Sequence, residues 1–255
     1  MGLFDKLFRR DSSGGQKCPS PTPEPQKETP VAPMKIDMSK HSENLNKVLI
    51  DMSKNAKIDM SKHVARVAMV LDYSGSMNHL YYYGAMQETI DRLLPIALKF
   101  DDNGELESWL FSDNYKRLSS VTKDNYEDYV KKVIGRSRLD MSGTYYAPVL
   151  EDVVDYYIEQ EPSSVPAFVI FITDGENMDQ ENTDYIIRKL SKYNMFIQFI
   201  GIGDEDFQYL KKLDDLGGRE NDNTGFLAVK DMNRLTDEQL YTEILKQYKD
   251  WLNRK

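Results

Sequence analysis

The sequence predicts an α/β fold: a doubly wound, mostly parallel six-stranded sheet with one antiparallel edge strand and helices on both faces. Residues 64–72, 166–175 and 195–203 are almost continuously apolar, as expected for strands that are buried on both faces of a sheet. Amphipathic helical patterns separate these runs, which is the order of a parallel sheet. Two shorter strands on either side of Asp113 and Asn114 indicate a hairpin, which adds the antiparallel edge strand.

The other elements follow from hydrophobic period and from turn residues. The first helix after strand 64–72 carries Met86, Ile90, Leu93 and Leu94 at the spacing of one apolar face. In chain order, the expected elements after this strand are a helix at 77–99, strands at 105–112 and 115–120, helices near 124–134 and 147–160, a strand at 166–175, a helix at 182–193, a strand at 195–203, a helix near 206–215, a strand at 225–230 and a helix at 236–252.

Composition and charge restrict the class of protein. The chain of 255 residues is 40% hydrophobic and has a net charge of −9. Residues 64–255 hold 22 Lys and Arg against 34 Asp and Glu, so nucleic acid is not the expected partner, because phosphate contacts need clustered cations. No apolar run approaches the roughly 20 residues of a membrane span, no secretory signal is evident, and Cys18 is the single cysteine. We therefore expect a cytoplasmic protein without a disulfide framework.

Three segments precede the α/β domain, which we place at 64–255. Residues 1–10, "MGLFDKLFRR", form a short amphipathic leader, either frayed or making a weak contact with a partner or the inner face of a membrane. Residues 11–33 are rich in Pro and Ser and are expected to be a disordered linker. Residues 34–63 contain repeated "IDMSK" units, which we interpret as short extended pieces. These pieces either pack on the edge of the domain or dock to another protein.

Oxygen-bearing side chains cluster where two of the buried strands end. Asp72, Ser74 and Ser76 lie in "VLDYSGSM", and Asp174 ends the strand "FITD". Thr144 lies in the glycine-containing loop "DMSGTYYAP" before a helix. Because parallel strands point their carboxyl ends to the same edge, these five side chains can share one crevice. Hard divalent cations prefer such oxygen ligands, although each residue could instead serve as a helix cap or a turn residue.

These motifs resemble those of von Willebrand factor A (VWA) domains, over about residues 64–252. "DYSGS" fits the DxSxS signature of the metal-ion-dependent adhesion site of that family, and "SGT" and "ITDG" follow in the family's order. The resemblance implies a Mg²⁺ site, with Mn²⁺ or Ca²⁺ as alternatives. Its direct ligands would be Ser74, Ser76 and Thr144, with Asp72 and Asp174 acting mainly through water. Ser142 departs from the pattern, because many members have a second glycine there.

The resemblance also implies what the site does. A metal held by three hydroxyls remains attractive to an anionic oxygen, so the expected partner is a protein that presents Asp or Glu, bound by a monomeric, non-enzymatic module. Tyr81, Tyr82, Tyr145 and Tyr146 flank the site and are predicted to form an aromatic rim for that partner. The "IDMSK" units followed by "HVARVAMVLDYSGSM" resemble the VWA proteins of bacterial tellurium-resistance clusters, which implies a role in a stress-response complex.

Two other classes of function stay open at this point. The first is a Mg²⁺-dependent phosphoryl-transfer enzyme with Asp72 as the nucleophile. Such enzymes commonly pair two acids in a DxD pattern, whereas here the second position is Ser74. The second is a scaffold that keeps the fold and binds no metal.

Overall fold

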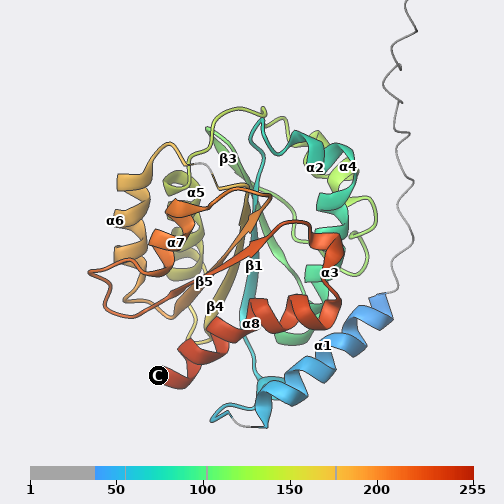
Figure 1. Ribbon diagram of the computed structural model, residues 1–255, viewed down its shortest axis with the longest axis vertical. Helices are drawn as coiled ribbons and strands as arrows, with labels where there is room; N and C mark the ends of the chain where they lie inside the picture. Colours follow the sequence, from blue (N-terminus) through green and yellow to red (C-terminus); the bar gives the residue numbers. More distant parts are fainter. Residues whose placement is uncertain (1–37, 55, 102, 176) are drawn as a thin grey trace, which may run out of the picture. The chain divides into compact units, whose positions relative to one another are not determined.

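The computed structural model describes residues 38–54, 56–101, 103–175 and 177–255, which contain a six-stranded sheet with helices on both faces (Figure 1). The strand order is β3-β2-β1-β4-β5-β6. All neighbouring strands are parallel except the antiparallel pair β2 and β3, so the predicted fold class is confirmed. The strands are β1 Arg66–Asp72, β2 Glu107–Phe111, β3 Tyr115–Arg117, β4 Ala167–Thr173, β5 Met195–Ile202 and β6 Thr224–Val229.

The helices lie in two layers, one on each side of the sheet. Helices α5, α6 and α7 cover one face, and α1, α3 and α8 cover the other (Figure 1). The helices are α1 Met38–Ser53, α2 Asn78–Tyr82, α3 Ala85–Phe100, α4 Tyr129–Lys132, α5 Ala147–Asp155, α6 Gln180–Leu190, α7 Gln208–Asp214 and α8 Asp237–Arg254. Among the described residues, none of these helices is long and apolar enough to span a membrane.

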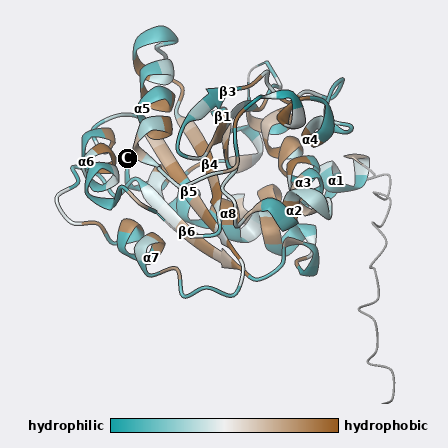
Figure 2. Ribbon diagram, turned by 90° about the horizontal axis from the view of Figure 1, so that it is seen from above, coloured by the Kyte–Doolittle hydropathy of each residue, from teal (hydrophilic) through white to brown (hydrophobic). Residues whose placement is uncertain are grey.

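The continuous apolar runs of β1 and β4 are explained by burial on both faces. In β1, Val67, Met69 and Leu71 point into the core under α1, α3 and α8, while Ala68 and Val70 point into the core under α5, α6 and α7. The hydropathy colours in Figure 2 show the same distribution, with apolar strands in the interior and polar helix surfaces outside. A doubly covered sheet therefore leaves the ends of the strands as the place where polar side chains can collect.

The interpretation of the repeat segment as extended pieces is wrong over its described part. Residues 38–53 form helix α1, and Met60–Lys62 form a 3₁₀ turn. Leu45, Val48 and Leu49 are buried in the core under α3 and α8. Their spacing, continued by Met52, is that of one helix face. The repeated "IDMSK" units suggested strand-like alternation instead of this helical period. Of the two roles expected for the segment, α1 fulfils packing against the following domain.

A partly buried polar cluster fixes α1 to the domain. The carboxylate of Asp237, at the start of α8, accepts hydrogen bonds from Asn44 (3.0 Å) and from Arg92 Nε (3.0 Å), and lies 2.6 Å from His41 Nδ1. Arg92 also donates to the carbonyl of Met232 (2.6 Å). Because Arg92 belongs to α3 and is 3% exposed, this cluster links α1, α3 and α8 through one satisfied charge pair.

Three predicted helices differ from those observed. The helix expected at 77–99 is two helices, α2 and α3, because Gly84 between them has φ +85°, a conformation that glycine adopts without strain. The segment at 124–134 is helical only in α4, and a 3₁₀ turn follows at Ile134–Arg136. The helix expected at 147–160 is α5 continued by a π-helical turn, Tyr156–Gln160. The expectations for 1–10 and 11–33 concern residues outside the described part of the chain.

Candidate metal centre

Three loops meet at the carboxyl end of β1 and β4. Ser74, in the loop after β1, forms an isolated parallel bridge with Ser142, and Gly75 N donates to Ser142 O (3.1 Å). On the other side of the same segment, Met178 N, in the loop after β4, donates to Thr144 O (2.9 Å). Residues 142–144 are therefore held between the loop that carries Asp72 and the loop that carries Asp174.

Asp72 is held in one orientation by its neighbours. It is fully buried, and its Oδ1 accepts from Ser74 N (2.8 Å), while its Oδ2 accepts from the hydroxyl of Thr173 (2.7 Å). Ser74 Oγ lies 3.1 Å from Ser76 Oγ, so the two hydroxyl oxygens are neighbours close to the Asp72 carboxylate. Ser74 is 2% exposed, whereas Ser76 is exposed. The hydroxyl pair therefore opens to solvent on one side only.

The negative charge of the site has no cationic counterpart among the described residues around it. Burial, the largest cause, and the nearby charge of Asp174 together raise the pKa of Asp72 to about 6, against the lowering effect of the hydrogen bonds from Thr173 and Ser74. Asp174 Oδ1 is buried and has no hydrogen-bond partner among the described residues. No Lys or Arg of the described chain forms an ion pair with either carboxylate. An unpaired buried carboxylate oxygen is costly, and a cation at this place would satisfy it.

The donor set fits a hard divalent cation rather than a softer metal. Within the described residues, no three His, Cys, Asp or Glu side chains come together in a group that could hold a metal. A metal here therefore depends on hydroxyl oxygens, and Thr144, which is 5% exposed, lies in the loop held between the two acidic loops. Carboxylate and hydroxyl oxygens suit Mg²⁺, Mn²⁺ and Ca²⁺.

Two residues that were not predicted as part of the site, Thr173 and Phe207, support it. Thr173 donates to Asp72, accepts from Gly175 N (3.1 Å), and its hydroxyl lies 2.9 Å from Tyr146 OH. The ring of Phe207 lies in a notch formed by Gly175 and Gly201, where an added Cβ would come within 2.6 Å and 2.7 Å of it. The position of Thr173 directly before Asp174 was a signal in the sequence. The left-handed backbone of Phe207, at φ +49°, had none.

The predicted rim of tyrosines is partly wrong. Tyr146 is fully buried, with its ring centroid 4.8 Å from that of Phe171, because it enters the core at the start of α5. The hydroxyl of Tyr81 is turned inward and donates to Asp72 O (2.7 Å). Tyr82 is 66% exposed, and Tyr145 is half-buried. Tyr82 and Tyr145 remain the candidates for a rim, because Tyr81, although half-buried like Tyr145, has its hydroxyl bonded to Asp72 O.

Comparison with known proteins identifies the class of this chain. The family model vWA-TerF-like, described as the vWA found in the TerF C terminus, matches residues 64–255. The chain belongs to this family of VWA domains, and the resemblance to the tellurium-resistance-associated group is confirmed. It is 39% identical over 198 residues to the protein YcbR of Bacillus subtilis (strain 168), which is uncharacterised, covering 77% of this chain and 81% of YcbR.

Solved structures share the fold at low identity. Proximal thread matrix protein 1 of the mussel byssus, solved with zinc in its MIDAS motif, has a TM-score of 0.53 at 19% identity. The match covers 74% of this chain and 46% of the mussel protein, so the chain spans about half its length. The manganese-loaded TRAP protein of Plasmodium vivax has a TM-score of 0.50 at 18% identity, over 66% of this chain and 70% of TRAP. Both likenesses concern the fold alone.

Proposed function

We propose that this chain is a non-enzymatic, Mg²⁺-dependent protein-binding module. Ser74, Ser76 and Thr144 would bind the metal directly, and Asp72 and Asp174 would act mainly through water. The hydroxyls leave most of the metal's charge unneutralised, so an Asp or Glu of a partner protein completes the shell. The metal supplies electrostatic attraction for that carboxylate, and the protein supplies a fixed set of oxygens.

One observation carries this proposal. The buried Asp174 Oδ1 lacks a partner among the described residues and belongs to a site with two carboxylates and no ion-paired cation. The two structural neighbours, one with zinc in its MIDAS motif and one loaded with manganese, support a divalent metal in this fold. We assign Mg²⁺ to this chain, with Mn²⁺ and Ca²⁺ as the alternatives that a titration separates.

The proposal also covers the surface that contacts the partner and the setting in which the module works. Tyr82 and Tyr145 are the aromatic residues we assign to the rim around the bound carboxylate. We place the module, as a monomer, in the bacterial cytoplasm and in a complex that responds to tellurium or other toxic cations. Membership in the TerF-type family supports this placement.

Phosphoryl transfer by Asp72 is disfavoured by the geometry of the carboxylate. Both of its oxygens accept hydrogen bonds from the protein, and the residue is fully buried. A nucleophile must instead present a free oxygen to its substrate. VWA domains are typically interaction modules, which agrees with this reading of the site.

Calorimetric titration with MgCl₂ tests the metal. We expect binding by the wild type, and loss of that binding in Ser76→Ala, which is safe for folding because Ser76 is exposed. Ser119→Ala, at another exposed serine, is the matched control and should bind as the wild type does. Equal heats for all three proteins would place the metal elsewhere. Turnover of a generic phosphate ester that Asp72→Ala abolishes would replace the binding module by an enzyme.

The second arm of the test concerns the partner. Proteins captured by the wild type in the presence of Mg²⁺ should be released by a chelator and should not be captured by Ser76→Ala. Capture that persists unchanged under chelation would show that the metal does not recognise the partner.

A further inference from the structure

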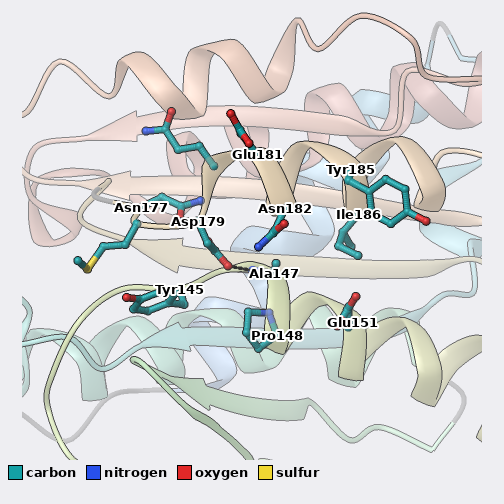
Figure 3. A pocket seen from close by; sticks show the side chains of 12 residues that line it. Tyr145, Ala147, Pro148, Glu151, Asn177, Asp179, Glu181, Asn182, Tyr185 and Ile186 are labelled. Carbon is teal, nitrogen blue, oxygen red and sulfur yellow. Dashed lines mark hydrogen bonds between the residues drawn. The ribbon is translucent and has the colours of Figure 1, made fainter.

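A groove between α5 and α6 lies beside the metal centre. It encloses about 900 Å³, and Figure 3 shows Pro148 and Glu151 on the α5 side facing Asn182 and Ile186 on the α6 side. A second hollow of about 290 Å³ lies between the same helices and shares Glu151 and Ile186 with the first. The two hollows therefore adjoin each other along α5 and its extension, and together they are called the groove.

The groove begins at the metal centre. Tyr145, which lines it, follows Thr144 directly in the chain. Met178, on the opposite wall, lies in the same loop as Asp174 and donates its backbone N–H to Thr144 O. A partner segment lying in the groove would therefore extend to the edge where the partner carboxylate is proposed to reach the metal.

Exposed apolar side chains line the groove. Met178 is 66% exposed and Tyr185 is 63% exposed, and both belong to its walls. The floor adds Ile186 and Pro148. Large apolar side chains gathered on a concave surface are typical of an interaction site.

The charges of the groove specify the sign of its occupant. Glu151, Asp155 and Glu159 line it from one side, at intervals of four residues along α5 and its π-helical extension, and Glu181 lines it from the other side. Lys189 is the only cation among its described lining residues. Glu151, Glu159 and Glu181 form no ion pair with any described residue. The field in the groove is therefore negative and favours a cationic segment.

Structural reasons favour a helical occupant. Both walls consist of helices and the loops next to them, so the groove offers no free strand edge to which an extended peptide could add. Glu151 and Asp155 lie about 6 Å apart along the axis of α5, at 1.5 Å per residue, and Glu159 continues the row in the π-helical turn. Lys or Arg side chains at positions i and i+4 of a second helix match the spacing of the first two acids.

We propose that the groove between α5 and α6 receives an amphipathic basic helix of the partner protein. Its apolar side chains contact Met178 and Tyr185, and its Lys or Arg side chains face Glu151, Asp155 and Glu159. In assigning this helix to the partner whose carboxylate reaches the metal, the inference rests on the proposed function. It adds that the partner is recognised by a helix as well as by one acidic residue.

The test uses the full chain and a fluorescent, amidated peptide of about 16 Leu and Lys residues in an amphipathic helical pattern, without any carboxylate. Anisotropy should show saturable binding that weakens as NaCl rises from about 50 to about 300 mM. The triple variant Glu151→Lys, Asp155→Lys and Glu159→Lys should bind at least about tenfold more weakly.

The matched control changes the same number of charges elsewhere. It carries Glu127→Lys, Glu205→Lys and Glu243→Lys, all at exposed positions outside the groove, and should bind within about twofold of the wild type. A peptide of identical composition but scrambled pattern should bind about tenfold more weakly than the amphipathic one. Equal weakening in both triple variants, or equal binding of the scrambled peptide, would reduce the effect to net charge and overturn the proposal.

Two further outcomes separate this proposal from its alternatives. Sedimentation that shows a dimer, dissociated by the groove variant, would mean that a second copy of the chain fills the groove and would also overturn the proposal. Ser76→Ala should bind the peptide as the wild type does, because the peptide carries no carboxylate. If the wild type binds the peptide but not Mg²⁺, the proposed metal site is refuted and the groove proposal stands. If the wild type binds Mg²⁺ but not the peptide, the groove proposal is refuted and the metal site stands.

Discussion

Asp72→Asn should stabilise the metal-free domain while removing its response to metal. At pH 7.5 the carboxyl is ionised in both the folded and the unfolded chain, but its folded pKa of about 6 lies above the ordinary 3.8. Ionisation in the folded state therefore costs about 3 kcal/mol, at 1.36 kcal/mol for each pKa unit. Asn also has an NH2 donor in place of one acceptor oxygen, so either the Ser74 N–H or the Thr173 hydroxyl loses its acceptor, which costs about 1.5 kcal/mol. We expect a net gain of about 1–2 kcal/mol in urea unfolding with EDTA.

Magnesium should make the wild type more stable than Asp72→Asn, the reverse of the order in EDTA. At a free Mg²⁺ concentration of 100 times the dissociation constant, the wild type should gain about 2.7 kcal/mol, and Asp72→Asn should gain almost nothing. Asp124→Asn, at an exposed carboxyl, is the control and should follow the wild type in both conditions. The reasoning is refuted if Asp72→Asn is less stable than the wild type in EDTA, or if Mg²⁺ stabilises the two proteins equally.

Three further predictions concern the domain that holds the site. Burial raises the pKa of Asp91 to about 7, so ionisation of its carboxyl destabilises the folded state most above pH 7. Asp91→Asn should therefore raise the urea midpoint at pH 8, and this gain should shrink as the pH falls from 7 towards 4. A gain that does not depend on pH would contradict this. Leu49→Ala in α1 should cost about 2–5 kcal/mol, whereas the exposed Ile50→Ala should cost less than about 0.5 kcal/mol; equal small losses would mean that α1 is not part of the core. Gly175 has φ +105°, and Gly175→Ala adds a Cβ 2.6 Å from the Phe207 ring. This variant should lose about 2 kcal/mol of stability in urea unfolding and should bind Mg²⁺ more weakly in calorimetry. An unchanged Mg²⁺ titration would show that the loop tolerates the added methyl group.

The strands were predictable because their signal is local. In a doubly covered sheet every position of a central strand is buried, so β1 and β4 appear in the sequence as unbroken apolar runs. Their direction then follows from the intervening helices, and direction alone brings Asp72 and Asp174 to one edge. Gly175 and Thr173 at the end of β4 were visible in the sequence as neighbours of Asp174. Their hydrogen bond to each other was not.

The helix on residues 38–53 shows where local reading failed. Its apolar period was present, but the repeated "IDMSK" letters suggested alternation instead. What stabilises the helix is its contact with α3 and α8, including the bonds of His41 and Asn44 to Asp237, almost 200 residues away in the chain. Helices gain most of their stability from such tertiary packing rather than from propensity.

By itself, the sequence determined the alternation of strands and helices and the position of oxygen-bearing residues at the strand ends, because hydrophobic period and chain direction are properties of short segments. Only the tertiary structure decided that Tyr146 is buried, that Phe207 supports the loop of Asp174, and that an acidic groove begins beside Thr144. Each of these depends on which surfaces meet across the fold. A side chain's burial and charge environment are set by neighbours that are distant in sequence, and no local pattern specifies them.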